Sequence, residues 1–142
     1  MKTARYSFVL AILSIIWANH SLQAENIYVL PNSKIQDAVN GAVDGDTVII
    51  LGGIYNEDVL VEGKNIKLVR EKGKSVEITG SLTYKNVTGP VVIRDFKIGR
   101  DSSKHLTLEN CERVGVEDLN LASGGGLIIK HSDVVARSCQ FA

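Results

Sequence analysis

The sequence has few cysteines, few aromatic residues and no excess of charge of either sign. Two cysteines in 142 residues are too few for a disulfide-framework protein. The 16 Lys and Arg residues are balanced by 16 Asp and Glu residues, which argues against a basic nucleic-acid-binding module, so no nucleic-acid partner is expected. Aromatic residues make up only 6% of the chain, and the core should therefore consist mainly of Val, Ile and Leu.

The chain also lacks a segment long and apolar enough to span a membrane, which needs about 20 residues. Its start is distinctive, because Lys2 and Arg5 precede an apolar run that ends at Ala18, and Ala24 offers a small residue for cleavage. This pattern predicts a secretory signal peptide over residues 1–24. We therefore expect a secreted or periplasmic protein without a membrane span.

Most of the chain after residue 43 consists of short β-type runs separated by Gly, Asn, Asp or Ser, and these runs repeat. Val91–Ile98 aligns without gaps on Val114–Leu121 at an offset of 23, and on Val134–Phe141 at an offset of 20. The shared pattern is apolar at positions one, three, six and eight. A second block precedes each copy, namely Leu82–Asn86, Leu106–Asn110 and Leu127–His131.

Each repeat of 20 to 24 residues thus holds three short strands. A chain of this length goes once around a β-helix, whose coils stack about 4.8 Å apart through parallel hydrogen bonds. We predict an all-β domain over residues 25–142, a right-handed parallel β-helix of roughly four to five coils. The leucine-rich repeat has a similar period, but the Asn or Cys that it requires at a fixed position occurs only once, at Asn110-Cys111.

One segment has helical periodicity. Ser33–Val43 places its apolar residues on one face, and Ser33 and Gln36 have the spacing of a capping box. An amphipathic helix here could cover the exposed apolar end of the first coil. We therefore expect an N-terminal capping helix over this range.

Four segments resemble the opening of right-handed parallel β-helix proteins of the pectin lyase-like superfamily. They are Ile35–Val39, Gly45–Leu51, Gly53–Val59 with its Gly-x-Tyr-x-Glu turn, and Ile66–Leu68. The superfamily includes pectin methylesterases and pectate, alginate and chondroitin lyases. The resemblance implies a protein that interacts with acidic polysaccharide and, if active, is a polysaccharide lyase or carbohydrate esterase. The motifs that carry the esterase residues are absent, so no catalytic residue is assigned.

The most basic stretch of the repeat is the candidate substrate-binding region. An acidic polysaccharide would need cationic groups of this kind, whereas the alternative is a solvated face whose Asn residues satisfy the turns. Neither histidine fits the spacing of a metal site. The candidate residues are Lys85, Arg100, Lys104, His105, Glu109, Lys130 and His131.

Stacking should also align the corner that follows the first aligned strand of each repeat. It places Arg94, Glu117 and Arg137 in a ladder of alternating charge and sets Asp95 beside Asp118. Two carboxylates one coil apart are weak candidates for a calcium site. The simpler interpretation is that Asp suits a corner with left-handed backbone, which leaves no metal ligand assigned.

The last coil closes the sequence without an apparent capping segment. Cys111 and Cys139 fall in different columns of the repeat, so we expect two free, mostly buried thiols. Either further coils follow in a longer protein, or the open end pairs end to end with another copy. The alternative to a polysaccharide-binding role is thus a non-catalytic structural or assembly module.

Overall fold

The computed structural model of the protein describes residues 23–121 and 125–141. The predicted signal peptide, residues 1–24, therefore lies outside the described residues except for its last two positions. In the described ranges, no helix has the length and apolar character needed to cross a membrane.

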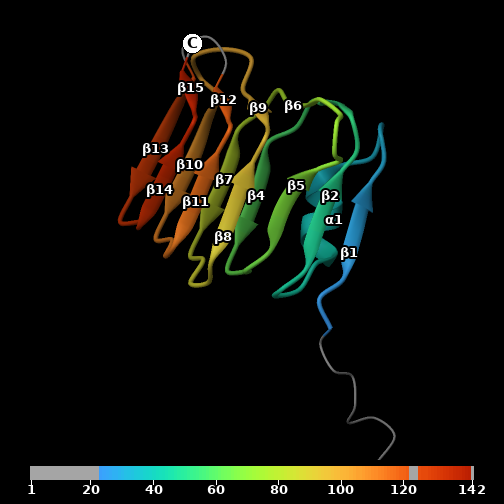
Figure 1. Ribbon diagram of the computed structural model, residues 1–142, viewed down its shortest axis with the longest axis horizontal. Coiled ribbons are helices and arrows are strands. Elements are labelled where there is room, and N and C mark those ends of the chain that lie inside the picture. Colours follow the sequence, from blue (N-terminus) through green and yellow to red (C-terminus); the bar gives the residue numbers. More distant parts are fainter. Residues whose placement is uncertain (1–22, 122–124, 142) are drawn as a thin grey trace, which may run out of the picture.

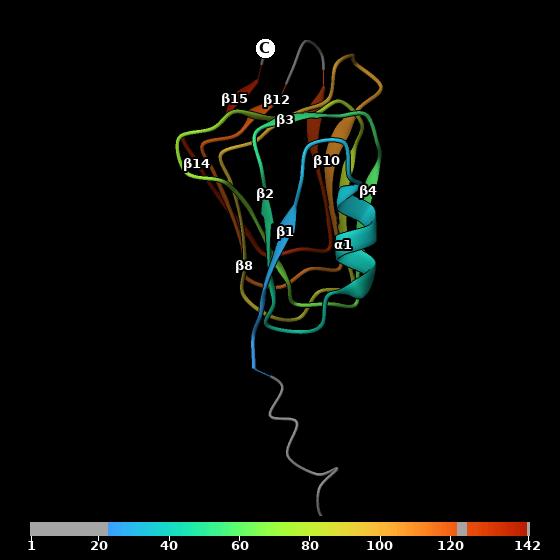
Figure 2. The same cartoon turned by 90° about the vertical axis from the view of Figure 1, so that its right-hand side faces the viewer.

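The chain winds into a parallel β-solenoid of about five coils, each coil being one turn around the axis (Figures 1 and 2). Three sheets run along its sides. Sheet A contains β1 (Asn26–Val29), β2 (Thr47–Ile50), β5 (Lys67–Arg70), β8 (Val91–Arg94), β11 (Val114–Glu117) and β14 (Val134–Arg137). Sheet B contains β3 (Gly53–Tyr55), β6 (Val76–Ile78), β9 (Lys97–Ile98), β12 (Asn120–Leu121) and β15 (Gln140–Phe141). Sheet C contains β4 (Val59–Glu62), β7 (Leu82–Lys85), β10 (His105–Glu109) and β13 (Gly126–Lys130).

The register of the strands is the one that the repeat predicts. Val114 pairs with Val91 on one side and with Val134 on the other. In sheet C, Leu106 pairs in the same way with Leu82 and Leu127. The predicted stacking of the later coils is confirmed.

Two strands of the first coils were not predicted. β1 precedes the helix and pairs with β2, so sheet A begins before residue 43, after which the sequence predicts the β-type runs. Gly53–Tyr55, interpreted as part of a turn, is strand β3 and pairs with β6. Tyr55 still points inward and is buried, which agrees with packing beside the first coil.

The core consists of columns of aliphatic side chains that touch from coil to coil. Val48, Leu68, Ile93 and Val116 form one such column in sheet A, and all four are buried. Burial of one such side chain contributes about 1.5–3 kcal/mol relative to exposure. Since each coil buries its side chains only against its neighbours, the stability of one coil depends on the next.

The corners between sheets repeat the same backbone conformation in successive coils. Positive φ angles of 48–66° recur at Asn86, Asn110 and His131 after sheet C, and at Asp95, Asp118 and Ser138 after sheet A. Asn and Asp tolerate left-handed backbone better than most residues. The structural interpretation of Asp95 and Asp118 as corner residues is therefore confirmed.

The single helix of the described residues, α1 (Ile35–Gly41), is shorter than the predicted Ser33–Val43. The predicted capping box between Ser33 and Gln36 is wrong, because no side chain of the cap position bonds the helix start. The carboxylate of Glu57, after β3, instead accepts hydrogen bonds from the backbone N–H groups of Ile35 (2.7 Å) and Gln36 (3.1 Å). A charged acceptor also interacts favourably with the positive end of the helix dipole.

Two further side chains connect α1 to the coil beside it. The Gln36 amide exchanges hydrogen bonds with the backbone of Leu60, at 2.7 and 3.0 Å. Lys64 Nζ donates to the carbonyl oxygens of Val39, Asn40 and Ala42 at the end of the helix, at 2.8–3.0 Å. α1 thus lies against β4, β1 and β2 (Figure 2).

Two buried tyrosines differ in how their hydroxyl groups are satisfied. Tyr55 donates to the carbonyl oxygen of Leu51 at 2.8 Å. The Tyr84 hydroxyl lies in the core and has no hydrogen-bond partner among the described residues. Burial raises the pKa of Tyr84, so the hydroxyl stays neutral.

Removing the two hydroxyl groups should therefore have different effects. We expect Tyr55→Phe to lower the free energy of unfolding by about 1 kcal/mol, because a made hydrogen bond is lost. Tyr84→Phe should leave it unchanged or raise it by up to about 1 kcal/mol, because an unsatisfied polar group leaves the core. Urea unfolding of the two variants measures the difference, and equal losses would contradict this arrangement of the core.

Candidate functional site

Four of the seven predicted substrate-binding residues lie where the strands of sheet C end. Lys85, Glu109 and Lys130 are register partners on β7, β10 and β13. Lys85 Nζ lies 3.5 Å from Glu109 Oε1, and Lys130 Nζ lies 3.8 Å from Glu109 Oε2. His131 follows Lys130 at the left-handed corner. Glu109 thus partly neutralises the two lysines that would bind a polyanion.

The other three predicted residues lie where the strands of sheet C begin. Lys104 Nζ contacts Asp58 Oδ1 at 3.2 Å, and Arg100 Nε lies 3.8 Å from Glu77 Oε1. Glu77 also pairs with Lys97 at 3.3 Å. The cations at this end are therefore matched by carboxylates from other coils.

Asp58 is the carboxylate at this end whose environment is most defined. Its Oδ1 accepts the backbone N–H of Ser81 at 2.7 Å, in addition to the contact with Lys104. The Ser81 N–H, followed by the Lys104 ammonium, lowers the pKa of Asp58 below its usual value. The group is ionised at neutral pH and serves as an acceptor rather than a proton donor.

The two histidines of the candidate set have roles in the local backbone structure. His105 Nδ1 accepts the N–H of Gly126 at 3.1 Å, across the step from β10 to β13. His131 has a φ of 48° and continues the corner column of Asn86 and Asn110. These contacts agree with structural roles for both side chains.

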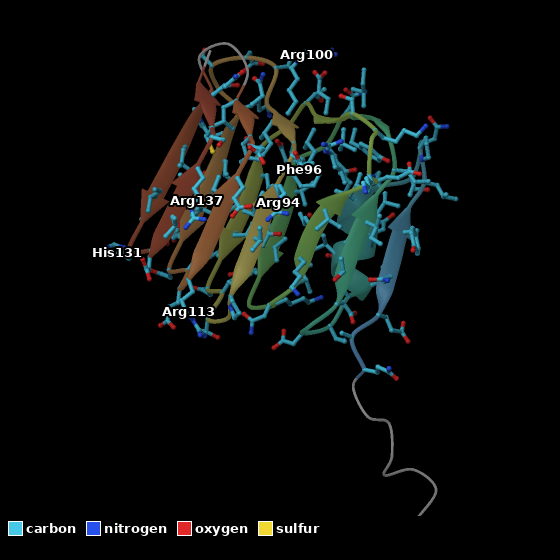
Figure 3. The ribbon with its side chains drawn as sticks, in the orientation of Figure 1. Arg94, Phe96, Arg100, Arg113, His131 and Arg137 are labelled. Carbon is cyan, nitrogen blue, oxygen red and sulfur yellow. The ribbon has the colours of Figure 1, made fainter. Side chains whose placement is uncertain are left out.

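The seven residues therefore form two groups and not one groove. β10 runs from His105 to Glu109, which separates its ends by roughly 13 Å. Figure 3 shows Arg100 and His131 at opposite ends of the strands. Polysaccharide binding by these residues stays a prediction, and a ligand touching both groups would have to run along the strands.

The predicted charge ladder on sheet A is present. Arg94 Nε donates to Glu117 Oε2 at 2.8 Å, and Glu117 is the register partner of Arg137. One coil earlier, Arg70 forms an ion pair with Asp95 at 3.2 Å. The corner carboxylate Asp95 therefore has a cationic partner on this surface.

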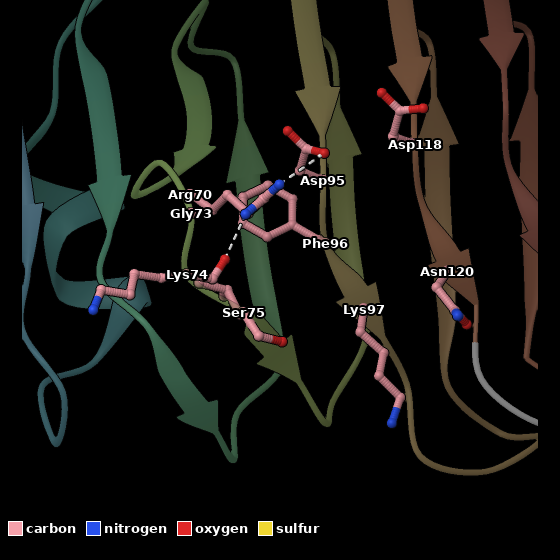
Figure 4. Close-up of a pocket in the computed structure, with 10 residues that line it drawn as sticks. Arg70, Gly73, Lys74, Ser75, Asp95, Phe96, Lys97, Asp118 and Asn120 are labelled. Carbon is pink, nitrogen blue, oxygen red and sulfur yellow. Dashed lines mark hydrogen bonds and ion pairs between the residues drawn. The ribbon is translucent and has the colours of Figure 1, made fainter.

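A shallow cleft lies over the corner between sheets A and B (Figure 4). It has a volume of about 520 Å³ and contains the cations Arg70, Lys74 and Lys97 together with Asp95 and Asp118. Among residues 23–121 and 125–141, no group of three or more His, Cys, Asp or Glu side chains could hold a metal ion. Asp95 and Asp118 therefore belong to no such group, and calcium binding at these two residues stays a prediction.

The described thiols agree with the sequence interpretation. Cys111 is free and buried, and Cys139 is free and partly buried. Cys111 Sγ lies 3.4 Å from the carbonyl oxygen of Tyr84 within the stacked core. Both cysteines behave as packing residues of their columns.

Sequence reasoning missed Glu57 and Asp58, the two carboxylates that organise the first coils. Glu57 stood within the Gly-x-Tyr-x-Glu segment, but its partner at the start of α1 lies 22 residues earlier in the chain. Asp58 contacts Lys104 across 46 residues. The Gly-x-Tyr-x-Glu pattern was the one signal that could have pointed to Glu57.

Comparison with protein-family models, with curated proteins and with solved structures finds no match to the chain. The pectin lyase-like resemblance is therefore not supported beyond the β-solenoid fold.

Proposed function

We propose that this chain is an exported, non-catalytic β-solenoid module that associates with a second copy through its last coil, formed by β13, β14 and β15. The observation that carries this proposal is the self-complementary outer edge of β14. The proposal of export rests on the sequence alone, namely on the predicted signal peptide over residues 1–24.

The last coil is the least covered part of the described solenoid. β13, β14 and β15 are each the final strand of their sheet, so one edge of each has no strand beside it in the described residues. Ile129 points inward but is 47% exposed, whereas its register partner Leu108 is fully buried. Unpaired strand edges above an apolar surface are templates for pairing with another chain.

Strand β14 fits an antiparallel copy of itself. Residues alternate between the faces of a strand, so Val135 and Arg137 share the outer face while Val134 and Ala136 face inward. Asp133, which directly precedes β14, is exposed as well. A two-fold axis at Val135 then sets Val134 opposite Ala136 of the copy. The same axis sets Asp133 opposite Arg137 twice, and opposite charges directly across strands are stabilising.

The residues of this edge are accessible. Val135 is 53% exposed, although it lies on a strand of a six-stranded sheet, and Asp133 and Arg137 are also exposed. An isologous contact of this kind would cover the two Val135 side chains together. It would also cover the inward side chains of both last coils.

We infer that α1 caps the opposite end of the solenoid. Its hydrogen bonds to Glu57 and Lys64, and those between its own Gln36 and the backbone of Leu60, hold it against the first coil. The proposed contact is isologous, so both copies use the same surface, and association through the last coil would close as a dimer and not extend as a fibre.

Charge reversal on β14 tests the dimer. In size-exclusion chromatography with light scattering, we expect the exported chain to be dimeric, and Arg137→Asp or Asp133→Arg to raise the dimer dissociation constant at least about tenfold. The double variant Asp133→Arg/Arg137→Asp should restore dimerisation, because it exchanges the two charges. A monomer at every concentration, or a double variant no better than the single ones, would refute the proposed contact.

A second candidate is the binding of an acidic polysaccharide of the pectin or alginate type. It is supported by Arg100 and Lys130, whose side chains remain 63% and 56% exposed despite their ion pairs. Exposed ion pairs are weak, so these cations remain free to exchange a protein carboxylate for a uronate. The resemblance to right-handed β-helix lyases and esterases points to the same class of ligand.

Removing the carboxylate that neutralises the lysines should strengthen such binding. Glu109→Gln is expected to increase the mobility shift with polygalacturonate, alginate or chondroitin at low salt, because Lys85 and Lys130 lose their shared partner. Glu112→Gln, at an exposed position that is not in the row of Lys85, Glu109 and Lys130, is the matched control. No shift with any polymer would remove this candidate, and unsaturated product would instead reveal a lyase.

A further inference from the structure

Asp46 is the one charged residue that is buried in the described part of the chain. It precedes β2, and only 3% of its surface is exposed. Its Oδ1 accepts the backbone N–H of Glu25 at 2.8 Å, and its Oδ2 accepts that of Val43 at 2.9 Å. These bonds, with that of Glu25 the stronger influence, lower the pKa of Asp46. The buried carboxylate is therefore ionised.

No cation balances this charge in the described residues. None of the ion pairs there includes Asp46. The two backbone donors satisfy its oxygens but supply no formal charge. A buried carboxylate of this kind gains from a cation that can replace one of its neutral donors.

One of the two donors stands at the predicted cleavage point. Cleavage after Ala24 would make the Glu25 nitrogen the first atom of the mature chain. Glu25 is held in place, because its carbonyl oxygen accepts the N–H of Thr47 at 2.8 Å. Ala24 is exposed, and within residues 23–121 and 125–141 every strand and helix begins at Asn26 or later.

We propose that removal of the leader converts the bond between the Glu25 nitrogen and Asp46 into an ion pair that anchors the mature N-terminus. This inference rests on the export included in the proposed function. A peptidase adds water across the Ala24–Glu25 bond, so Ala24 leaves as a carboxylate and the Glu25 nitrogen becomes an amine. The amine takes up a proton and presents an ammonium group to Asp46.

Other charged groups near this point are turned to other partners or to solvent. Asp44 accepts the N–H of Asn65, and Lys64 is bound to the carbonyls at the end of α1. The Glu25 side chain is exposed, as is Lys67 of β5, whose backbone N–H donates to the Asp46 carbonyl. None of these side chains forms a hydrogen bond with the Asp46 carboxylate or the Glu25 nitrogen.

The ion pair predicts a characteristic dependence of stability on pH. An α-amino group ordinarily has a pKa of about 7.7–8.0, and the adjacent carboxylate raises this pKa in the folded protein. The contribution is therefore complete below the ordinary pKa and is lost as pH rises through the raised value.

The experiment compares two chains that retain all strands and α1. One begins at Glu25, released from a fusion by a protease that leaves no extra residue, and the other begins at Gln23. Intact mass verifies each start. At about pH 6.5 we expect the chain beginning at Glu25 to melt about 3–5 °C higher, and the difference to vanish by about pH 9.5.

Asp46→Asn should abolish that difference between the two chains, whereas Asp44→Asn, at the exposed carboxylate two residues earlier, should preserve it. Equal melting of the two wild-type chains, or a difference that survives in Asp46→Asn, would overturn the ion pair. Sequencing the N-terminus of protein exported from the full chain tests processing separately. A start other than Glu25 would refute the cleavage without bearing on the melting comparison.

Discussion

Parallel pairing of each coil with the next, residue against equivalent residue, is the constraint from which the other features of this protein arise. Because strands in one sheet lie about 4.8 Å apart, side chains at equivalent positions must be compatible with themselves as neighbours. Aliphatic residues meet this condition inside, as the column through Leu68, Ile93 and Val116 shows. Outside, the same condition favours alternating charge, as in Lys85, Glu109 and Lys130.

Stacking also leaves unpaired strand edges and apolar side chains at the first and the last described coil. At one end, α1 lies against the first coil, where the Glu57 carboxylate and the Lys64 ammonium group bond its backbone and its own Gln36 amide bonds the backbone of Leu60. In the last described coil, no further coil of the described residues covers inward side chains such as Ile129, whereas the equivalent side chains of earlier coils are covered. The two proposals follow from this difference between the ends. Near the first coil, Asp46 would anchor the mature N-terminus, and the last coil would associate with a second copy.

The sequence was sufficient for the features that recur in the later coils. Register, inward columns and the left-handed corners at Asp95 and Asp118 each leave a mark at a fixed spacing. Features that occur once leave no such mark. The helix cap was assigned to the nearby Ser33, whereas the structure uses Glu57, which becomes adjacent only after the chain has completed a coil. A distant carboxylate displaced the local cap because its two oxygens accept both first N–H groups at once.

The candidate site shows the same limit. Residue type singled out these basic residues as candidates, but it could not show that Arg100 and Lys104 lie at the opposite end of the strands from Lys130. Nor could it show that Asp58 and Glu77 would supply partners for these cations from other coils. Such pairings depend on loop paths between strands, which the repeat does not determine.

Pairs of new cysteines on the outer face of sheet C test the stacking most directly. The two native cysteines are first replaced, by Cys111→Ala and Cys139→Ser. Thr83 and Thr107 are register partners, so their Cα atoms should lie about 4.8 Å apart, within disulfide reach of about 7 Å. Thr83→Cys with Thr107→Cys should therefore form a disulfide on mild oxidation. Thr83→Cys with Ile128→Cys, two coils and roughly 9.6 Å apart, should not. Ready oxidation of the second pair, or failure of the first in a folded protein, would contradict the stacked arrangement.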